Sequence, residues 1–375
     1  MRYLDLEAVF KIEIYIIVAA LVYLIGGINS ANDAHKETRV RRTAITRKIT
    51  AIEVVLLSAM LGWYSTICSK IPYSSDRGNY VRRFTEYWKD PWTMGLNAIG
   101  DFLHLFTNEP KALFFTVTFI CVALTLVAFR ISSEGDQNAL LLYVCSNCIF
   151  YTFYLLKQAP AMAFATISIV YLLRRKYIVS GLLLAIAITF HESAVVLIPL
   201  YAMLIFAHND HMRNISLVIM LITLLFFSGV SRVAFNFINR WLPNLMDEVG
   251  GYQGVNGAMA YRLNLVTAIK GIPVYMVFYQ SIVKRNTLGN RIACYDQYLV
   301  MAGFSSLATL LSSYMYWMWR FGAYCYFPLY LFASELYRLD PDRHAANTFW
   351  IMILGPLALF SFRYLCQIFL IYGGF

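Results

Sequence analysis

The feature that most constrains this chain is a series of apolar runs separated by short polar loops. A membrane-spanning helix needs about 20 apolar residues, because roughly 30 Å of hydrocarbon must be crossed at about 1.5 Å per residue. The runs therefore predict a polytopic, all-α integral membrane protein with about 10–12 transmembrane helices. The apolar runs cover residues 10–28, 49–66, 111–130, 138–156, 159–173, 178–190, 193–206, 214–230, 265–283, 296–316, 321–337 and 349–371.

Composition supports the same class. Of the 375 residues, 59% are hydrophobic and 14% are charged, whereas a soluble protein carries roughly 25% charged residues. No segment is long and polar enough to form a separate soluble domain, so we predict one multi-span domain over residues 1–375. The net charge is +10, but the basic residues lie mostly in short loops. That distribution follows the positive-inside pattern and argues against a nucleic-acid partner.

The charges of the loops predict the orientation. Segment 31–48 holds six Lys and Arg residues and is expected in the cytoplasm. Alternation from that segment places two long loops outside, at residues 67–110 and 231–264, with an interfacial helix expected in the first. It also brings Lys157-Gln158 and His191-Glu192 close to the outer face.

The first outer loop interleaves charged and aromatic residues in the stretch YSSDRGNYVRRFTEYWKDPW. Arginine forks bind phosphate oxygens, and aromatic faces stack on sugar rings. An amphipathic helix at the membrane interface, with arginines reaching lipid headgroups, explains the same pattern. Both interpretations stay open from residue types alone. The candidates in this loop are Asp76, Tyr80, Arg82, Arg83, Trp88 and Trp92.

His191 and Glu192 stand side by side in the apolar stretch AITFHESAVVLIP. Adjacent helical residues point about 100° apart, so at least one of the two should face a cavity or a partner and not lipid. The ordinary pKa of histidine suits a general base. A histidine that is simply packed and hydrogen-bonded is the plain alternative.

Further cations lie near the predicted outer face. Lys157 and Gln158 separate two apolar runs, and Arg320 lies beside Trp319 in YMYWMWRFGAYCYF. A lysine at a helix end often reaches toward the headgroups, and an aromatic belt explains the Trp and Tyr residues. Arg320 fits neither pattern and should find an anion or a carboxylate. Arg262, in the second outer loop, is expected to join it.

The order of these motifs resembles the EpsG-like branch of the Wzy-type polysaccharide polymerases. The resemblance covers about residues 75–330. Where the family usually has Arg-Gln-x-x-Ala, this chain has Lys157-Gln158-Ala159, which keeps the charge but loses the bidentate fork. The similar stretches are SDRGNYVRRF, LLKQAPAMAFATISIVYLLRRK, AITFHESAVVLIPLY with a Phe-His-x-Ser-Ala signature, and YWMWRFGAYCYFPLY.

The resemblance implies a GT-C-like glycosyltransferase in a bacterial inner membrane. Such polymerases join oligosaccharide repeat units carried on undecaprenyl pyrophosphate, at the outer face, to make O-antigen, capsule or exopolysaccharide. The expected partners are these lipid-linked oligosaccharides, membrane lipid and a chain-length regulator protein. No metal and no other cofactor is expected, because Arg and Lys can stabilise a departing pyrophosphate.

Roles for individual residues follow from this resemblance. His191 is the expected base for the acceptor hydroxyl, with Asp76 or Glu192 as a second base or as the group that orients the histidine. The remaining candidates bind substrate. Arg82, Arg83, Lys157, Arg262 and Arg320 are expected to hold the pyrophosphate, Tyr80, Trp88, Trp92 and Trp319 to stack on sugars, and Gln158 to assist beside Lys157.

Two other functions are alternatives to the polymerase. A flippase for lipid-linked oligosaccharides, or another multi-span transporter, would share the many spans and the buried charges. It should show repeat symmetry or matching interrupted helices in its two halves, and neither is visible in the sequence. A membrane acyltransferase with His191 as base would need a further histidine or an Asp or Asn partner, which the sequence does not reveal.

Overall fold

The computed structural model of the protein describes residues 51–67, 76–132, 137–146, 151–153, 155–206, 265–312 and 319–366. The regular structure in these ranges is helical and contains no strand, as predicted. The helices are α2 (Ala51–Ile67), α3 (Asp76–Thr85), α4 (Met94–His104), α5 (Pro110–Ser132), α6 (Gln137–Cys145), α8 (Gln158–Leu173), α9 (Tyr177–Phe190), η2 (Glu192–Val196), α10 (Leu197–Phe206), α14 (Leu265–Val283), α15 (Arg285–Leu288), α16 (Tyr295–Leu311), α17 (Trp319–Ala323), α18 (Tyr326–Leu339) and α19 (Arg343–Cys366).

Two helices in the described ranges have the length and apolar composition of a membrane span, at Pro110–Ser132 and Arg343–Ser361. Other apolar runs form shorter helices than predicted. The run at 321–337 is divided between α17 and α18, and the run at 193–206 begins as the 3₁₀ helix η2 before α10. The predicted runs at 10–28 and 214–230 lie outside the described residues.

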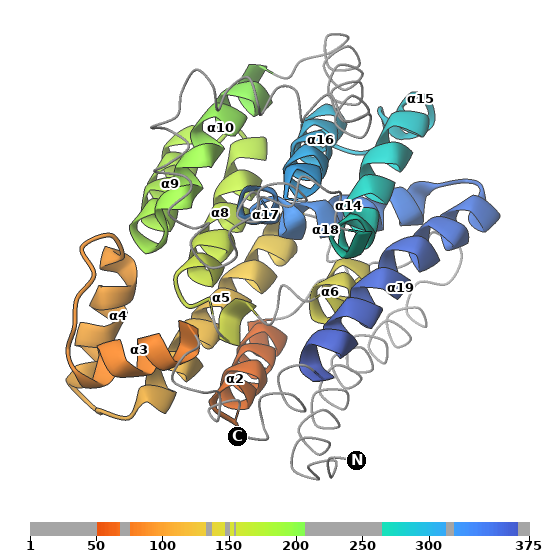
Figure 1. Cartoon of the computed structure of the whole chain (residues 1–375). Coiled ribbons are helices and arrows are strands. Elements are labelled where there is room, and N and C mark those ends of the chain that lie inside the picture. Colours follow the sequence, from red (N-terminus) through yellow and green to blue (C-terminus); the bar gives the residue numbers. More distant parts are fainter. Residues whose placement is uncertain are drawn as a thin grey trace, which may run out of the picture.

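Helix α8 is buried along most of its length and lies between α5 and α9 (Figure 1). Its alternating small residues Ala159, Ala161, Ala163 and Ala165 are all buried. Small side chains let neighbouring backbones approach closely, which is the usual basis of helix packing in membranes. The packing of α8 fixes the position of the polar residues at its start.

Hydroxyl groups join α8 to α9 and α10. Ser168 Oγ donates to the carbonyl of Ser180 at 2.6 Å, and Ser180 Oγ donates to the carbonyl of Ser168 at 2.9 Å. Tyr201 OH donates to Ser168 Oγ at 2.7 Å. Hydroxyl pairs of this kind satisfy polar groups between apolar helices without an ionised group. The three helices are therefore held in register.

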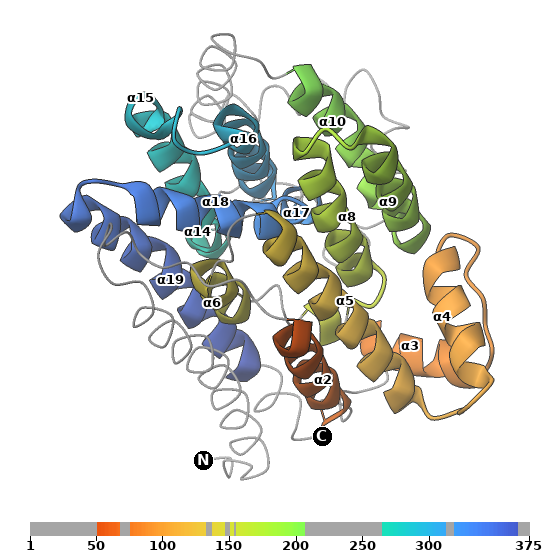
Figure 2. The same cartoon turned by 180° about the vertical axis from the view of Figure 1, so that it is seen from behind.

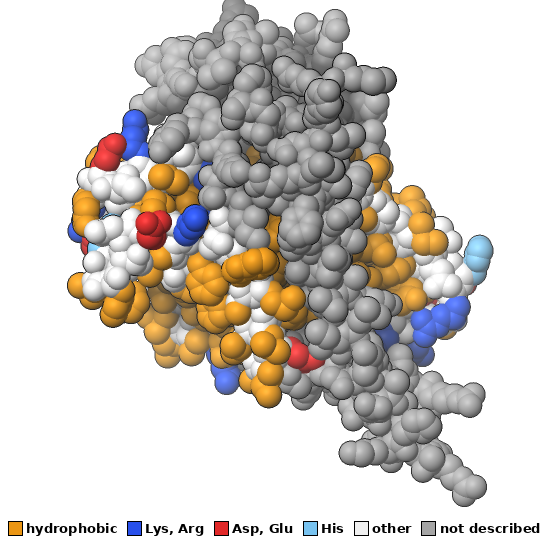
Figure 3. Space-filling model, turned by 90° about the horizontal axis from the view of Figure 1, so that it is seen from below, with side chains coloured by type: hydrophobic (Ala, Val, Ile, Leu, Met, Phe, Trp, Pro, Cys, Tyr) orange, Lys and Arg blue, Asp and Glu red, His pale blue; other side chains and the backbone are white. Residues whose placement is uncertain are grey.

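Helices α3 and α4 stand out at the side of the helical body (Figures 1 and 2). They lie in the segment 67–110, which the sequence predicts to be an outer loop with an interfacial helix. Helix α4 and the residues around it expose Met94, Phe102, Leu105 and Phe106. Seen from below, hydrophobic side chains also cover much of the described surface (Figure 3). An exposed apolar face of this size is typical of a helix that meets lipid.

The two ends of the molecule differ in charge. The connection between α8 and α9, with Arg174, Arg175 and Lys176, lies at the end opposite α3 and α4 (Figures 1 and 2). Helix α15, which follows Lys284 and begins with Arg285, lies at that end too. The second long loop predicted outside, at 231–264, is not among the described residues.

The sequence Asp340-Pro341-Asp342 forms the turn between α18 and α19. Lys284 Nζ donates to Asp340 at 2.9 Å. Asp342 Oδ1 accepts from the backbone N–H groups of His344 and Ala345 at 3.1 Å. These bonds satisfy free N–H groups in the first turn of α19.

Candidate functional site

Polar residues from four segments meet at the end of the bundle near α3 and α4. The segments are the turn at residues 86–93, the start of α8, the break between α9 and η2, and the short helix α17. Helix η2 contacts both α8 and α17. Residues far apart in the sequence are thereby brought to one place.

Asp90 is where two cations converge. Its Oδ2 accepts from Arg83 Nη1 at 3.0 Å and from Lys157 Nζ at 2.6 Å. Its Oδ1 accepts from the backbone N–H of Trp92 at 3.0 Å. One carboxylate therefore faces two positive charges, and the cluster keeps a net positive charge.

The local backbone explains why Asp90 is held in this position. Its carbonyl accepts from Thr93 N–H at 3.0 Å and from Asn97 Nδ2 at 2.7 Å. These bonds close the turn that leads into α4. Burial alone would raise the pKa of Asp90, but the hydrogen bonds from Lys157, Trp92 N–H and Arg83 outweigh burial and lower the pKa to about 2. Asp90 is therefore a permanent anion at neutral pH.

His191 breaks the helix between α9 and η2 and lies outside both. Its backbone is extended, with φ −153° and ψ 121°. The ring Nδ1 accepts from Ser193 N–H at 3.1 Å and lies 2.9 Å from Ser193 Oγ. Ser193 Oγ is in turn 2.8 Å from Tyr324 OH. His191 is thus the residue that caps η2, a position usually taken by Ser, Thr, Asp or Asn.

Charge and burial keep the His191 ring neutral. Burial lowers the pKa of His191 first, and the positive charges of Arg320 and Lys157 lower it further, to about 4. The same two cations are therefore close enough to act on the ring. An anion bound between them would reverse their effect on the histidine.

Gln158 and Arg320 approach each other at the start of α8. Gln158 is 1% exposed, and its Nε2 donates to the carbonyl of Arg320 at a long 3.4 Å. Among the described residues, neither Gln158 Oε1 nor Arg320 Nε has a hydrogen-bond partner. A buried polar atom without a partner is costly unless a ligand or water completes it. The pair therefore suits a polar ligand.

The structure thus brings together five of the predicted site residues: Arg83, Lys157, Gln158, His191 and Arg320. Three more of the predicted residues differ in exposure. Tyr80 is buried in the core, whereas Arg82 and Glu192 are exposed. The contacts that orient the His191 ring come from Ser193.

The aromatic candidates also differ in their surroundings. Trp88 and Trp92 are exposed, and the Arg83 guanidinium lies 4.3 Å from the Trp88 ring centroid. Trp319 packs on Tyr151, with ring centroids 5.1 Å apart. Asp76 begins α3, but its side chain, like all of Arg262, is outside the described part of the chain.

Asp90, Ser193 and Tyr324 belong to the site but were not predicted. Asp90 precedes a proline, which signals a turn but not an ion pair. Ser193 follows the histidine by two residues, a spacing at which its N–H can reach the side chain of a capping residue. Tyr324 lies 131 residues further on, and nothing local in the sequence indicates that contact.

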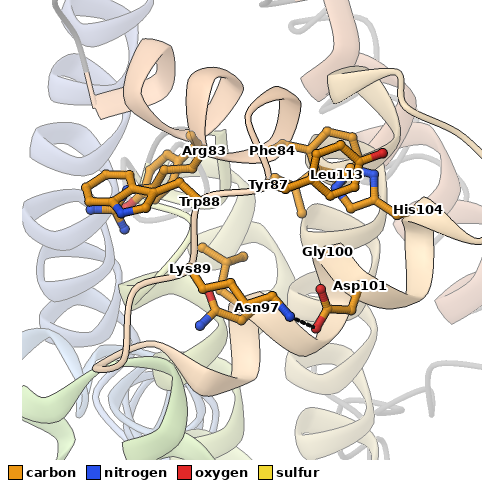
Figure 4. Close-up of a pocket in the computed structure, with 12 residues that line it drawn as sticks. Arg83, Phe84, Tyr87, Trp88, Lys89, Asn97, Gly100, Asp101, His104 and Leu113 are labelled. Carbon is orange, nitrogen blue, oxygen red and sulfur yellow. Dashed lines mark hydrogen bonds and ion pairs between the residues drawn. The ribbon is translucent and has the colours of Figure 1, made fainter.

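A pocket opens next to Asp90, between α3 and α4 (Figure 4). The ring of His104 lies between those of Phe84 and Tyr87, with both centroid distances 4.1 Å. Lys89 Nζ pairs with Asp101 at 2.8 Å. The pocket is lined by Tyr80, Arg83, Phe84, Tyr87, Trp88, Lys89, Leu96, Asn97, Gly100, Asp101, His104 and Leu113. Because Arg83 and Asn97 also bind Asp90, the pocket and the cation cluster share residues.

Comparison with known proteins gave one match. The model of the EpsG family matches residues 55–371 of the chain. No curated protein and no solved structure matched the chain. The matched range contains Asp90, Lys157, His191 and Arg320, so the whole site lies within the similarity.

Proposed function

We propose, since the chain belongs to the EpsG family, that this membrane protein is a polysaccharide polymerase acting on lipid-linked glycans. In this proposal it joins oligosaccharide repeat units carried on undecaprenyl pyrophosphate, for O-antigen, capsule or exopolysaccharide synthesis. Family membership supports the general role in polysaccharide synthesis. The lipid-linked donor is what the resemblance to Wzy-type polymerases implies, and the residue roles are inferred from the site.

The observation that carries the proposal is the cation cluster beside a neutral histidine. Lys157 and Arg83 share the single carboxylate of Asp90. The positive charges of Arg320 and Lys157 both lower the pKa of His191. Preorganised positive charge stabilises the negative charge that develops on a departing pyrophosphate. We propose that these side chains perform that role without a metal ion.

The proposed reaction is a displacement at the anomeric carbon of the growing chain. The bond from this carbon to the pyrophosphate oxygen breaks, and its electron pair leaves with the lipid pyrophosphate. The acceptor hydroxyl of the next repeat unit forms the new glycosidic bond and loses its proton. We propose that Glu192 or Asp76 is the carboxylate that accepts this proton. His191 is proposed to contact the reacting groups.

Location follows from the charges at the two ends. The basic connection at residues 174–176 and helix α15 lie opposite α3 and α4, and basic loops favour the cytoplasm. We therefore propose that the site faces the periplasm or exterior of a bacterial inner membrane. Trp88 and Trp92 are the proposed sugar platforms, since both are exposed near the pocket. We also propose a chain-length regulator as partner, without assigning it a surface.

The test uses purified protein in nanodiscs with a defined undecaprenyl-pyrophosphate-linked repeat unit, and it follows chain length on gels. Wild type should extend the glycan, while Lys157→Ala and Arg320→Ala should lower the rate about 100-fold, the usual effect of losing one stabilising group. Lys111→Ala, an exposed lysine at the start of α5, is the matched control and should behave as wild type. Transfer of the lipid across liposomes without extension would instead indicate a flippase.

A further inference from the structure

We infer that His191 is a hydrogen-bond donor to the departing pyrophosphate, acting through Nε2–H, and that Ser193 and Tyr324 are positioning residues that set this tautomer. The inference rests on the proposed function and deepens it. It replaces the role of base, which the sequence suggests for His191, with that of a neutral donor.

The first step is the bond at Nδ1. Ser193 N–H points at His191 Nδ1 over 3.1 Å. A backbone N–H can only donate, so Nδ1 must offer its lone pair and carries no proton. An imidazolium has a proton on both nitrogens, and the ring is therefore neutral. Its single proton lies on Nε2.

The second step is the hydroxyl chain behind the ring. Ser193 Oγ lies 2.9 Å from Nδ1 and 2.8 Å from Tyr324 OH. Because Nδ1 has no proton, Ser193 is the donor in the first contact, which leaves its oxygen free to accept from Tyr324. Tyr324 is fully buried between α17 and α18. A partner at one ring nitrogen sets the state of the other.

The third step is that the backbone around the ring is fixed. His191 N–H donates to the carbonyl of Ala187 at 3.1 Å, and the carbonyl of His191 accepts from Ala194 N–H at 3.0 Å. The side chain therefore leaves a rigid corner between two helices. With Nδ1 occupied, Nε2 is the nitrogen available to a substrate.

Charge decides what Nε2–H meets. The positive charges of Arg320 and Lys157 lower the pKa of His191 and so oppose protonation of its ring. A base placed among cations is weakened, whereas a neutral donor beside them adds a third contact to an anion. The phosphate oxygen that receives the electron pair of the breaking bond is such an anion. His191 keeps its proton throughout, and the proton of the acceptor hydroxyl goes to a carboxylate such as Glu192.

Three substitutions separate a donor from a base. In His191→Gln the side-chain amide N–H₂ reaches about as far as Nε2 and donates, but it cannot take a proton. His191→Asn keeps an acceptor for Ser193 N–H and lacks the distant donor, and His191→Ala lacks both. We expect Gln to keep kcat within about 10-fold of wild type, and Asn and Ala to lose about 100-fold or more. A Gln variant as inactive as Ala would overturn the donor role.

A second measurement reads the tautomer directly. Nitrogen-15 NMR of ring-labelled protein in nanodiscs, minus the spectrum of His191→Asn, isolates one of the six histidines. We expect a proton on Nε2 and none on Nδ1 at pH 7, and an Nδ1–H or imidazolium signal would overturn the inference. Tyr324→Phe should lower kcat a few-fold, leave KM unchanged and increase the Nδ1–H fraction. Tyr337→Phe is the control, because the Tyr337 hydroxyl donates to Asn347 Oδ1 away from the site.

The two proposals fail in different ways. If wild type does not extend the glycan, the proposed polymerase is wrong, whatever the tautomer. If wild type extends it and the Gln variant does not, the polymerase stands and only the donor role is wrong.

Discussion

Asp90 shows how one residue organises the cations of the site. Its carboxylate lies 2.6 Å from Lys157 Nζ and 3.0 Å from Arg83 Nη1. A pyrophosphate offers the same cations more negative charge than one carboxylate, so it can compete with Asp90 for them. In the proposed reaction, Asp90 therefore keeps the cations in place until the pyrophosphate binds.

The pH dependence of unfolding should report this ion cluster. The pKa of Asp90 is lowered from the ordinary 3.8 to about 2. A lowered carboxyl pKa adds stability that is complete above the ordinary pKa and is lost as the pH falls through the folded value. The full contribution is about 2 kcal/mol, about half of it lost by pH 3. The unfolding free-energy gap between wild type and Asp90→Asn should therefore narrow by about 1 kcal/mol from pH 7 to pH 3.

At the scale of elements, the site depends on where helices stop. Hydropathy predicts α14 with its observed ends and places α8 and α9 within one or two residues, because long apolar runs are typical of helices that lie in a membrane or a protein core. It does not predict the division between α17 and α18 or the Ser193 contact at His191. Those features depend on single hydrogen bonds and on a tyrosine 131 residues away, which apolar periodicity does not encode.

Gly95 links α4 to the histidine corner. A Cβ at Gly95 would lie 2.7 Å from the ring of Phe190, which precedes His191 and stacks on Phe164. Gly95→Ala should therefore displace α4 or Phe190, destabilise the protein by about 1–3 kcal/mol and lower glycan extension. Gly181→Ala on α9, with nothing within 4 Å, should be neutral or slightly stabilising. Equal thermal stability of the two variants would contradict the close approach.

Arg77 ties α3 to the helical body. It is 1% exposed, donates to the carbonyls of Phe153 and Ser65 at 2.7 and 2.8 Å, and lies 3.6 Å from the ring centroid of Phe114. Arg77→Lys cannot reproduce this fork, so it should lower the unfolding free energy by about 2–3 kcal/mol. Arg82→Lys, an exposed neighbour, should change it little. Denaturation in detergent compares the two variants. An Arg77→Lys unfolding midpoint equal to that of wild type would contradict the claim that Arg77 holds α3 on the helical body.

At the scale of the whole molecule, the composition of the sequence predicts a membrane protein. The basic loops predict its orientation in the membrane. The helical class is confirmed, and family membership supports the membrane assignment. The number of spans is less accessible from sequence, because an apolar run such as 321–337 can hold two short helices instead of one span.

Orientation can be tested by labelling in intact cells. We expect Lys89→Cys, exposed in the turn before α4, to react with a membrane-impermeant maleimide. Lys176→Cys, exposed in the connection between α8 and α9, should react only after permeabilisation. The wild-type chain, with its native cysteines, sets the background. The reverse pattern would place the site in the cytoplasm.

The most direct test of the central claim is the stoichiometry of the reaction. Purified protein in nanodiscs is given a lipid-linked repeat unit, and both the new glycosidic bonds and the released undecaprenyl pyrophosphate are counted. We predict one lipid pyrophosphate released for each bond formed, with both signals lost in Lys157→Ala. Bond formation without lipid release, or no bond formation by the wild-type protein, would contradict the account.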